Sequence, residues 1–199
     1  MEKVVSQVEL LSRPPGLEAC FDLIVQADEV APSAAFGGAI RDADCGAYYG
    51  WEASRIKDYD IRVWLPADNH QARVAAFAAR LGAAAGTEVQ VVPSAGSGRP
   101  RYCLLYRGLD LDISIRPPVN NSLAVARVAI DRAGDSDAGL SSVAIAPDGT
   151  AWATAEYLSD RNNRQITIYP RPNSEARLDA YAARMQEKFP GHQVIRLAA

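Results

Sequence analysis

The residues most suited to chemistry are two pairs of aspartates. Asp58 and Asp60 form one pair, and Asp110 and Asp112 form the other. On a β-strand, residues two apart point to the same face with Cα atoms about 6.5 to 7 Å apart, so each pair presents carboxylate oxygens, which hard divalent cations prefer. If the two strands are neighbours, three carboxylates meet and require cations to neutralise them. The pattern predicts a site for two Mg²⁺ ions, with Mn²⁺ as the alternative, about 3.5 to 4 Å apart.

A second feature is the pair Gly37-Gly38, which lies after a short apolar segment and directly before residues that favour a helix. Glycine lets the backbone approach a ligand closely, and a helix N-terminus presents unpaired N–H groups to an anion. Arg41, one turn into that helix, is placed to add a charge-assisted contact. We therefore predict that Gly37, Gly38 and Arg41 bind the phosphates of a nucleotide.

Two further arginines share the strand face that carries the acids. Arg62 follows Asp60 on the first strand, and Arg116 follows Asp112 on the second. Either could hold a phosphate or the attacking group, but a structural salt bridge to a neighbouring aspartate is about as frequent a role. Both are candidate nucleotide-binding residues, ranked behind the glycine pair.

These residues need a sheet to position them, and alternation of polar and apolar residues indicates two of its strands. Residues 57–65 and 109–116 alternate strictly, with the acids on one face and apolar residues on the other. Helical spacing, glycine and proline stops and turn residues define the other elements. We predict helices over residues 17–28, 70–81, 122–130 and 175–189, and a helix that begins at residue 39 and gives way to a loop before residue 50. We also predict strands over 33–36, 87–92, 101–106, 165–169 and 193–197, and a hairpin over 142–154.

Length and composition limit what these elements build. The chain has 199 residues, a net charge of -3 and a hydrophobic fraction of 48%, which suits one full-sized core without disulfides. We predict a single domain over residues 1–199, with a core at about 17–170 and a C-terminal helix–strand appendage at 171–199. The mild acidity argues against broad non-specific nucleic-acid binding.

Cysteine usage and the N-terminus predict where the protein works. Cys20, Cys45 and Cys103 are widely spaced and odd in number, and with two histidines they form no zinc-type pattern. The first residues lack the basic and apolar regions of an export signal, and no apolar stretch is long enough to cross a bilayer. We expect a reduced cytoplasmic protein that does not enter a membrane.

The order of these motifs resembles a known family. Residues 36–42 (FGGAIRD), followed by residues 57–61 (KDYDI), resemble the head domain of the polymerase-beta nucleotidyltransferase superfamily. Its nearest branch is that of bacterial poly(A) polymerases and CCA-adding tRNA nucleotidyltransferases. Residues 110–116 resemble the strand with the family's third acid, and residues 137–149 resemble the stretch that begins RRDFTINA. The resemblance spans roughly residues 33–169.

The resemblance implies a nucleotidyltransferase fold, α/β or α+β, with a mixed, largely antiparallel sheet flanked by helices. It also implies Mg²⁺-dependent transfer of a nucleoside monophosphate from an NTP to a hydroxyl. Asp58 and Asp60 would bind both metals, and Asp112, favoured over Asp110 by the family pattern, would bind the metal that activates the acceptor. The rival function is a non-catalytic nucleotide- or partner-binding module on the same fold.

The sequence also departs from the family. The arginine pair of RRDFTINA is replaced by Asp135-Ser136, and its Phe-Thr-Ile-Asn by residues 138–141. In the arginine-rich helix that contacts the triphosphate in the family, only Arg177 and Arg184 are candidates here. The helical body that holds tRNA has no counterpart in these residues. We therefore expect weak binding to bulk RNA, and the acceptor stays open among an RNA end, a protein side chain and a small molecule.

Overall fold

The computed structural model describes residues 3–51, 56, 58–93, 100–118, 124–170 and 174–198. In chain order its elements are β1 (Val5–Val8), α1 (Leu17–Ala27), β2 (Ser33–Phe36), α2 (Gly38–Tyr49), β3 (Asp58–Trp64), α3 (His70–Ala85), β4 (Gln90–Val92), β5 (Arg101–Tyr106), β6 (Leu109–Arg116), α4 (Val125–Gly134), the 3₁₀ helix η2 (Gly139–Ser141), β7 (Val143–Ile145), β8 (Ala151–Thr154), α5 (Ala155–Asn163), β9 (Gln165–Ile168), α6 (Glu175–Lys188) and β10 (Gln193–Arg196). None of the helices within these described ranges combines the length and the apolar character needed to cross a membrane.

Eight strands form one sheet in the order β1-β8-β7-β2-β3-β6-β5-β4, and β9 and β10 form a separate parallel pair. Within the large sheet every neighbouring pair is antiparallel except β3 and β6. The predicted mixed, largely antiparallel sheet flanked by helices is therefore confirmed. The parallel pair consists of the two strands that carry the aspartates, so these strands are neighbours, as the predicted site requires.

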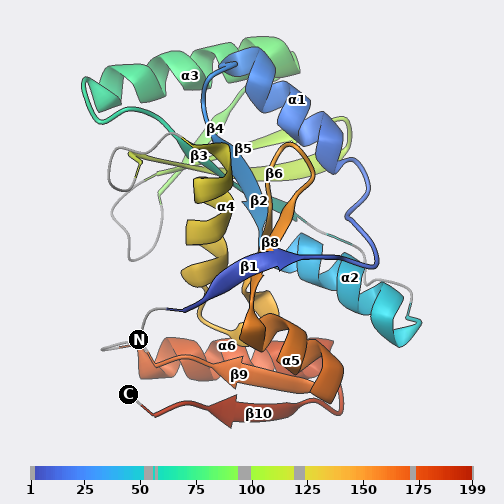
Figure 1. Cartoon of the computed structure of the whole chain (residues 1–199). Helices are drawn as coiled ribbons and strands as arrows, with labels where there is room; N and C mark the ends of the chain where they lie inside the picture. The colour runs from blue at the N-terminus through green and yellow to red at the C-terminus, as the bar shows by residue number, and fades with distance from the viewer. Residues whose placement is uncertain are drawn as a thin grey trace.

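Different helices cover the two faces of the large sheet (Figure 1). The apolar faces of α1 and α3 pack on one face, against the inward residues of β3, β5 and β6. On the other face, α4 lies over β2, β7 and β8 and encloses a smaller core that includes Trp64. Trp64 and Asp60 are four residues apart on one strand, so they share this second face. The aspartates therefore lie on the α4 side of the sheet.

A third core joins the C-terminal elements to α2. Figure 1 shows α5, α6, β9 and β10 gathered below the large sheet. The buried apolar residues of this core are Cys45, Ala138, Leu140, Ile166, Ile168, Leu178, Ala182, Met185 and Phe189. Helix α6 thus packs against residues that precede it by more than a hundred positions, which fixes its position relative to the start of α2.

Some elements differ from the sequence prediction. β1 and α5 were not predicted, and α4 ends at Gly134 rather than near residue 130. The predicted start of α4 near Ser122 and the tip of the loop after β4 lie outside the described residues. α5 follows β8 directly, with the Thr154 hydroxyl accepting from the Tyr157 N–H at its N-terminus. Its second half, Ser159-Asp160-Arg161-Asn162-Asn163, has no apolar periodicity, so tertiary contacts must hold it.

Candidate active site

The Gly37-Gly38 turn joins β2 to α2, as predicted. Gly37 has φ 77° and ψ −129°, a conformation that side chains rarely adopt. Its N–H donates to the Val143 carbonyl at 3.3 Å, which ties the turn to β7. A Cβ added at Gly37 would lie 3.6 Å from Asp60 Oδ2. The turn therefore brings the N-terminus of α2 beside one of the predicted acids.

The four aspartates lie on one face of the parallel β3–β6 pair. Asp60 is opposite Asp112 in the strand register, and Asp58 is opposite Asp110. Asp58 and Asp110 are exposed, whereas Asp60 is half-buried and Asp112 is buried. By register, Asp112 rather than Asp110 is the acid of β6 that lies next to Asp60.

Burial and mutual repulsion perturb these carboxylates. Burial, followed by repulsion from Asp58 and Asp112, raises the pKa of Asp60 to about 6. Burial also raises the pKa of Asp112, and the Arg101 guanidinium opposes that shift. Perturbed carboxylates of this kind cluster at functional sites, where a bound cation can relieve the repulsion.

Asp112 is paired with an arginine of the neighbouring strand. Its Oδ2 accepts a hydrogen bond from Arg101 in an ion pair across the β5–β6 ladder. Among the described residues, no three or more His, Cys, Asp or Glu side chains form a group that could hold a metal ion. The convergence of Asp58, Asp60 and Asp112 at metal-bridging distance stays a prediction. In this structure Arg101 supplies a positive charge beside Asp112.

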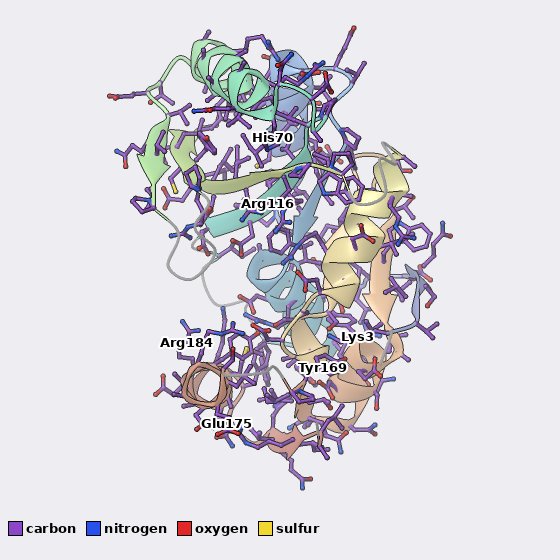
Figure 2. The ribbon with its side chains drawn as sticks, turned by 90° about the vertical axis from the view of Figure 1, so that its left-hand side faces the viewer. Lys3, His70, Arg116, Tyr169, Glu175 and Arg184 are labelled. Carbon is purple, nitrogen blue, oxygen red and sulfur yellow. The ribbon has the colours of Figure 1, made fainter. Side chains whose placement is uncertain are left out.

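A cleft of about 780 Å³ opens at Asp60. Its walls are the glycine turn, the C-terminal end of α4 with the segment that follows, and α6. Figure 2 shows Arg184 on the side of α6 toward the sheet. The cleft is lined by Phe36, Gly37, Gly38, Arg41, Asp60, Arg132, Asp135, Ser136, Asp137, Ser141, Tyr181, Arg184, Met185, Glu187 and Lys188.

Arg41 lines the cleft together with both glycines, and the protein holds its side chain in place. The guanidinium pairs with Asp42 at 2.8 Å and donates to Ser141 Oγ at 2.9 Å. Lys188 pairs with the same Asp42. Burial lowers the pKa of Arg41, but the opposing effect, in which Asp42 has the largest part, is stronger. The pKa of Arg41 therefore lies above the ordinary value of an arginine. A Cβ at Gly38 would lie 3.7 Å from Arg41 Nη2, so this cation borders the first residue of α2.

Arg62 and Arg116 are not among the residues that line this cleft. Arg62 donates from Nε to Ser114 Oγ at 2.8 Å, and Arg116 donates to the Ile115 carbonyl at 2.9 Å. Arg116 is four residues from Asp112, which corresponds to about 13 Å along a strand, so the two residues are well separated. Figure 2 shows Arg116 within the sheet, distant from α6. The structure does not bring these two predicted residues to the cleft.

Two cleft cations, Arg132 of α4 and Lys188 of α6, were missed by the sequence analysis. Each looks like an ordinary polar residue of an amphipathic helix, so no sequence signal distinguishes it. Of the two arginines considered on α6, Arg184 lines the cleft, whereas Arg177 pairs with Asp137 at 2.5 Å and is not among the lining residues. The helix packing alone decides which basic residues reach the cleft.

No family model and no curated protein matches this chain. Several solved structures are similar to it. A tRNA-processing enzyme in an apo form aligns with a TM-score of 0.59 at 18% identity, over 96% of this chain and 46% of that one. The CCA-adding enzyme of Thermotoga maritima, complexed with tRNA, aligns with a TM-score of 0.57 at 19% identity, over 100% of this chain and 44% of that one. The CCA-adding enzyme of Bacillus stearothermophilus with CTP aligns at 0.50 and 15%, over 92% and 41%.

These alignments cover between 92% and 100% of this chain. This chain has the nucleotidyltransferase fold. The similarity extends beyond residues 33–169, because the tRNA-bound enzyme aligns with the whole chain, α6 and β10 included. This chain spans less than half the length of each of these solved proteins.

Proposed function

We propose that this chain is a nucleotidyltransferase that moves a nucleoside monophosphate from an NTP to a hydroxyl acceptor. The observation that carries the proposal is the position of Asp60, where the glycine turn, the parallel β3–β6 pair and the cleft meet. The cleft volume, about 780 Å³, is in the range of sites that enclose small ligands. The fold shared with CCA-adding enzymes supports the same general class of activity.

The aspartate set fits a hard divalent cation. Asp58, Asp60 and Asp112 offer carboxylate oxygens from neighbouring backbone positions, which are the donors that Mg²⁺ and Mn²⁺ prefer. Repulsion among these carboxylates contributes to the raised pKa of Asp60, and a cation would relieve it. We infer that the three residues hold the metal and that Asp112 exchanges Arg101 for it. When bound, the metal would neutralise triphosphate charge and lower the pKa of the acceptor hydroxyl.

The chain's own groups would orient the nucleotide. The N–H groups that open α2 and the positive end of its helix dipole favour a phosphate beside Gly37 and Gly38. Arg41 is fixed next to them by Asp42 and Ser141 before any ligand binds. Because these groups are already ordered, binding costs little conformational entropy and the α-phosphate can be held in line with the attacking hydroxyl.

The test is incubation of the protein with each NTP, labelled at the α-phosphate, together with Mg²⁺ and cell extract. We expect label to enter one acceptor fraction with the wild type and none with Asp60→Asn. The rival, a non-catalytic binding module, is favoured by the Arg101–Asp112 pair, which neutralises the third acid. That rival predicts nucleotide binding without labelling of any fraction.

Binding to bulk tRNA is expected to be weak and salt-sensitive. Each phosphate contact needs an available cation, whereas this chain has a net charge of -3. At the cleft, Asp42 already compensates Arg41 and Lys188. A filter-binding titration with mixed tRNA at near-physiological salt measures this. Sub-micromolar affinity would contradict the prediction and favour an RNA acceptor held along its length.

Arg101→Gln is expected to raise the affinity for Mn²⁺ about two- to fivefold, because a half-exposed ion pair of modest strength no longer competes for Asp112. Calorimetric titration with MnCl₂ in the absence of nucleotide measures the change. Arg73→Gln is the control, since the Arg73 side chain is about as exposed as that of Arg101, at 48% against 43%, and its pair with Asp68 lies at the start of α3. Equal affinities in the wild type and both variants would place Arg101 outside the metal site.

A further inference from the structure

The C-terminal end of α4 places Arg132 against the residue that precedes the glycine turn. Its guanidinium lies 3.9 Å from the centroid of the Phe36 ring. Phe36 directly precedes Gly37 and is the register partner of Asp60. Arg132 therefore lies over the residue that connects the glycine turn to the acidic strand, and the positive charge of Arg132 is among the influences that lower the pKa of Asp60.

Arg132 is largely buried, and three carboxylates act on its charge. Its side chain is 15% exposed, and its Nε is buried without a hydrogen-bond partner among the described residues. Its ion pair is with Asp135 at 3.0 Å, and the Asp135 side chain is 60% exposed. Burial lowers the pKa of Arg132, with Asp135, Asp60 and Asp137 opposing the shift. A buried guanidinium whose ion-pair partner is largely exposed is suited to accept a second anion.

The other cations of the cleft are held differently. Arg41 and Lys188 share one buried carboxylate, Asp42. Arg41 and Arg184 also lie over aromatic rings, at 5.3 Å and 5.7 Å from the ring centroids, but Arg132 is closer to its ring, at 3.9 Å. A guanidinium stacked on a ring can present an edge of its plane to a phosphate in a bidentate contact. In the segment that follows α4, Asp135-Ser136 stands where the related sequence pattern has two arginines. Arg132 lies about one turn earlier, on α4, and supplies a positive charge to the same wall of the cleft.

We propose that Arg132 binds a phosphate group of the nucleotide, on the α4 wall of the cleft, in place of the arginine pair that Asp135-Ser136 replaces. The identity of the ligand as a nucleotide rests on the proposed function. Phosphate and Asp135 compete for the same guanidinium, so Asp135 lowers the affinity of the site. Arg132 is thus a specificity feature of this chain, supplied by α4 rather than by the segment after it.

The test measures binding of inorganic tripolyphosphate, ATP and adenosine in EDTA by calorimetry, so that neither metal nor turnover contributes. Arg132→Met should weaken tripolyphosphate and ATP binding about ten- to a hundredfold and leave adenosine binding unchanged. Arg132→Lys should recover part of the loss, because charge returns without the planar fork. Asp135→Asn should tighten tripolyphosphate binding severalfold. Arg127→Met is the matched control, since Arg127 pairs with Asp131 on the same helix and does not line the cleft.

The outcomes separate this inference from the proposed function. Unchanged tripolyphosphate affinity in Arg132→Met, or an equal loss in Arg127→Met, would overturn it. Weaker binding in Asp135→Asn would overturn the competition between phosphate and Asp135, and with it the assignment. A wild type that binds no tripolyphosphate refutes the inference as well. A wild type that binds tripolyphosphate through Arg132 but labels no acceptor fraction supports the inference and refutes the transferase.

Discussion

Asp60→Asn is expected to lower the rate of nucleotide transfer about a thousandfold while leaving the fold intact. Loss of a metal ligand removes several kcal/mol of transition-state stabilisation, and about 4 kcal/mol corresponds to that factor. The fold should tolerate the change, because the amide removes a half-buried charge that repels Asp58 and Asp112. Label transfer from the α-labelled NTP gives the rate, and circular dichroism gives the thermal midpoint.

The same variant is expected to change how stability depends on pH. The pKa of Asp60 rises from its ordinary 3.8 to about 6 on folding. The folded state therefore binds the proton more tightly than the unfolded chain, so stability from this group falls as pH rises from about 4 to about 6. The difference is about 3 kcal/mol. In Asp60→Asn this dependence should be absent, and above pH 6 the variant should be at least as stable as the wild type.

Asp22→Asn is the control for the loss of one carboxylate, since Asp22 is exposed on α1, over the opposite face of the sheet. Its transfer rate should equal that of the wild type. If Asp60→Asn also transfers label at the wild-type rate, the metal-dependent mechanism is refuted. If it unfolds instead, the carboxylate has a structural role that its electrostatic environment does not predict.

Asp44→Ala is expected to destabilise the fold by about 3 to 5 kcal/mol, the largest stability effect we predict. Asp44 is fully buried and joins three segments of the chain. It accepts hydrogen bonds from the Leu11 N–H at 2.7 Å, the Tyr157 hydroxyl at 2.6 Å and Arg161 at 2.7 Å. Alanine leaves these donors without an acceptor and leaves the largely buried Arg161 unpaired. Thermal and urea denaturation, followed by circular dichroism, measure the loss.

Two further variants test the Asp44 network. Asp44→Asn retains an acceptor oxygen and should recover part of the stability. Asp148→Ala removes an exposed acid from the β7–β8 turn and should cost under about 1 kcal/mol. A thermal midpoint of Asp44→Ala within about 2 °C of the wild type would contradict the prediction, since 3 kcal/mol corresponds to at least about 6 °C in a chain of this size. Asp44 would then be dispensable for folding.

The local elements around the site could be predicted from the sequence. Strict alternation located β3 and β6 and placed all four aspartates on one polar face, because side chains of a strand alternate between faces whatever the strand pairs with. The glycine pair marked the β2–α2 turn, because a positive φ at Gly37 needs glycine. The Pro147-Asp148-Gly149 turn marked the β7–β8 hairpin, because Gly149 also has a positive φ.

The elements that escaped prediction lack a local signal. α5 is largely polar, and it is anchored through Tyr157 and Arg161 to Asp44, more than a hundred residues earlier in the chain. Arg62 and Arg116 have the right residue type and the right face, yet neither lines the cleft. Residue type and strand face are local properties, whereas distance from the cleft depends on which helices enclose it.

The sequence by itself determined the parts that follow from periodicity and backbone conformation: the two acidic strands, the glycine turn and the fold class. The tertiary structure decided which charges meet. Lys188 reaches Asp42 across 146 positions, Arg101 forms an ion pair with Asp112, and Arg132 is brought over Phe36 by the packing of α4. The physical reason is that charge compensation acts through space, so the partner of a charged side chain is fixed only when the helices and strands have packed.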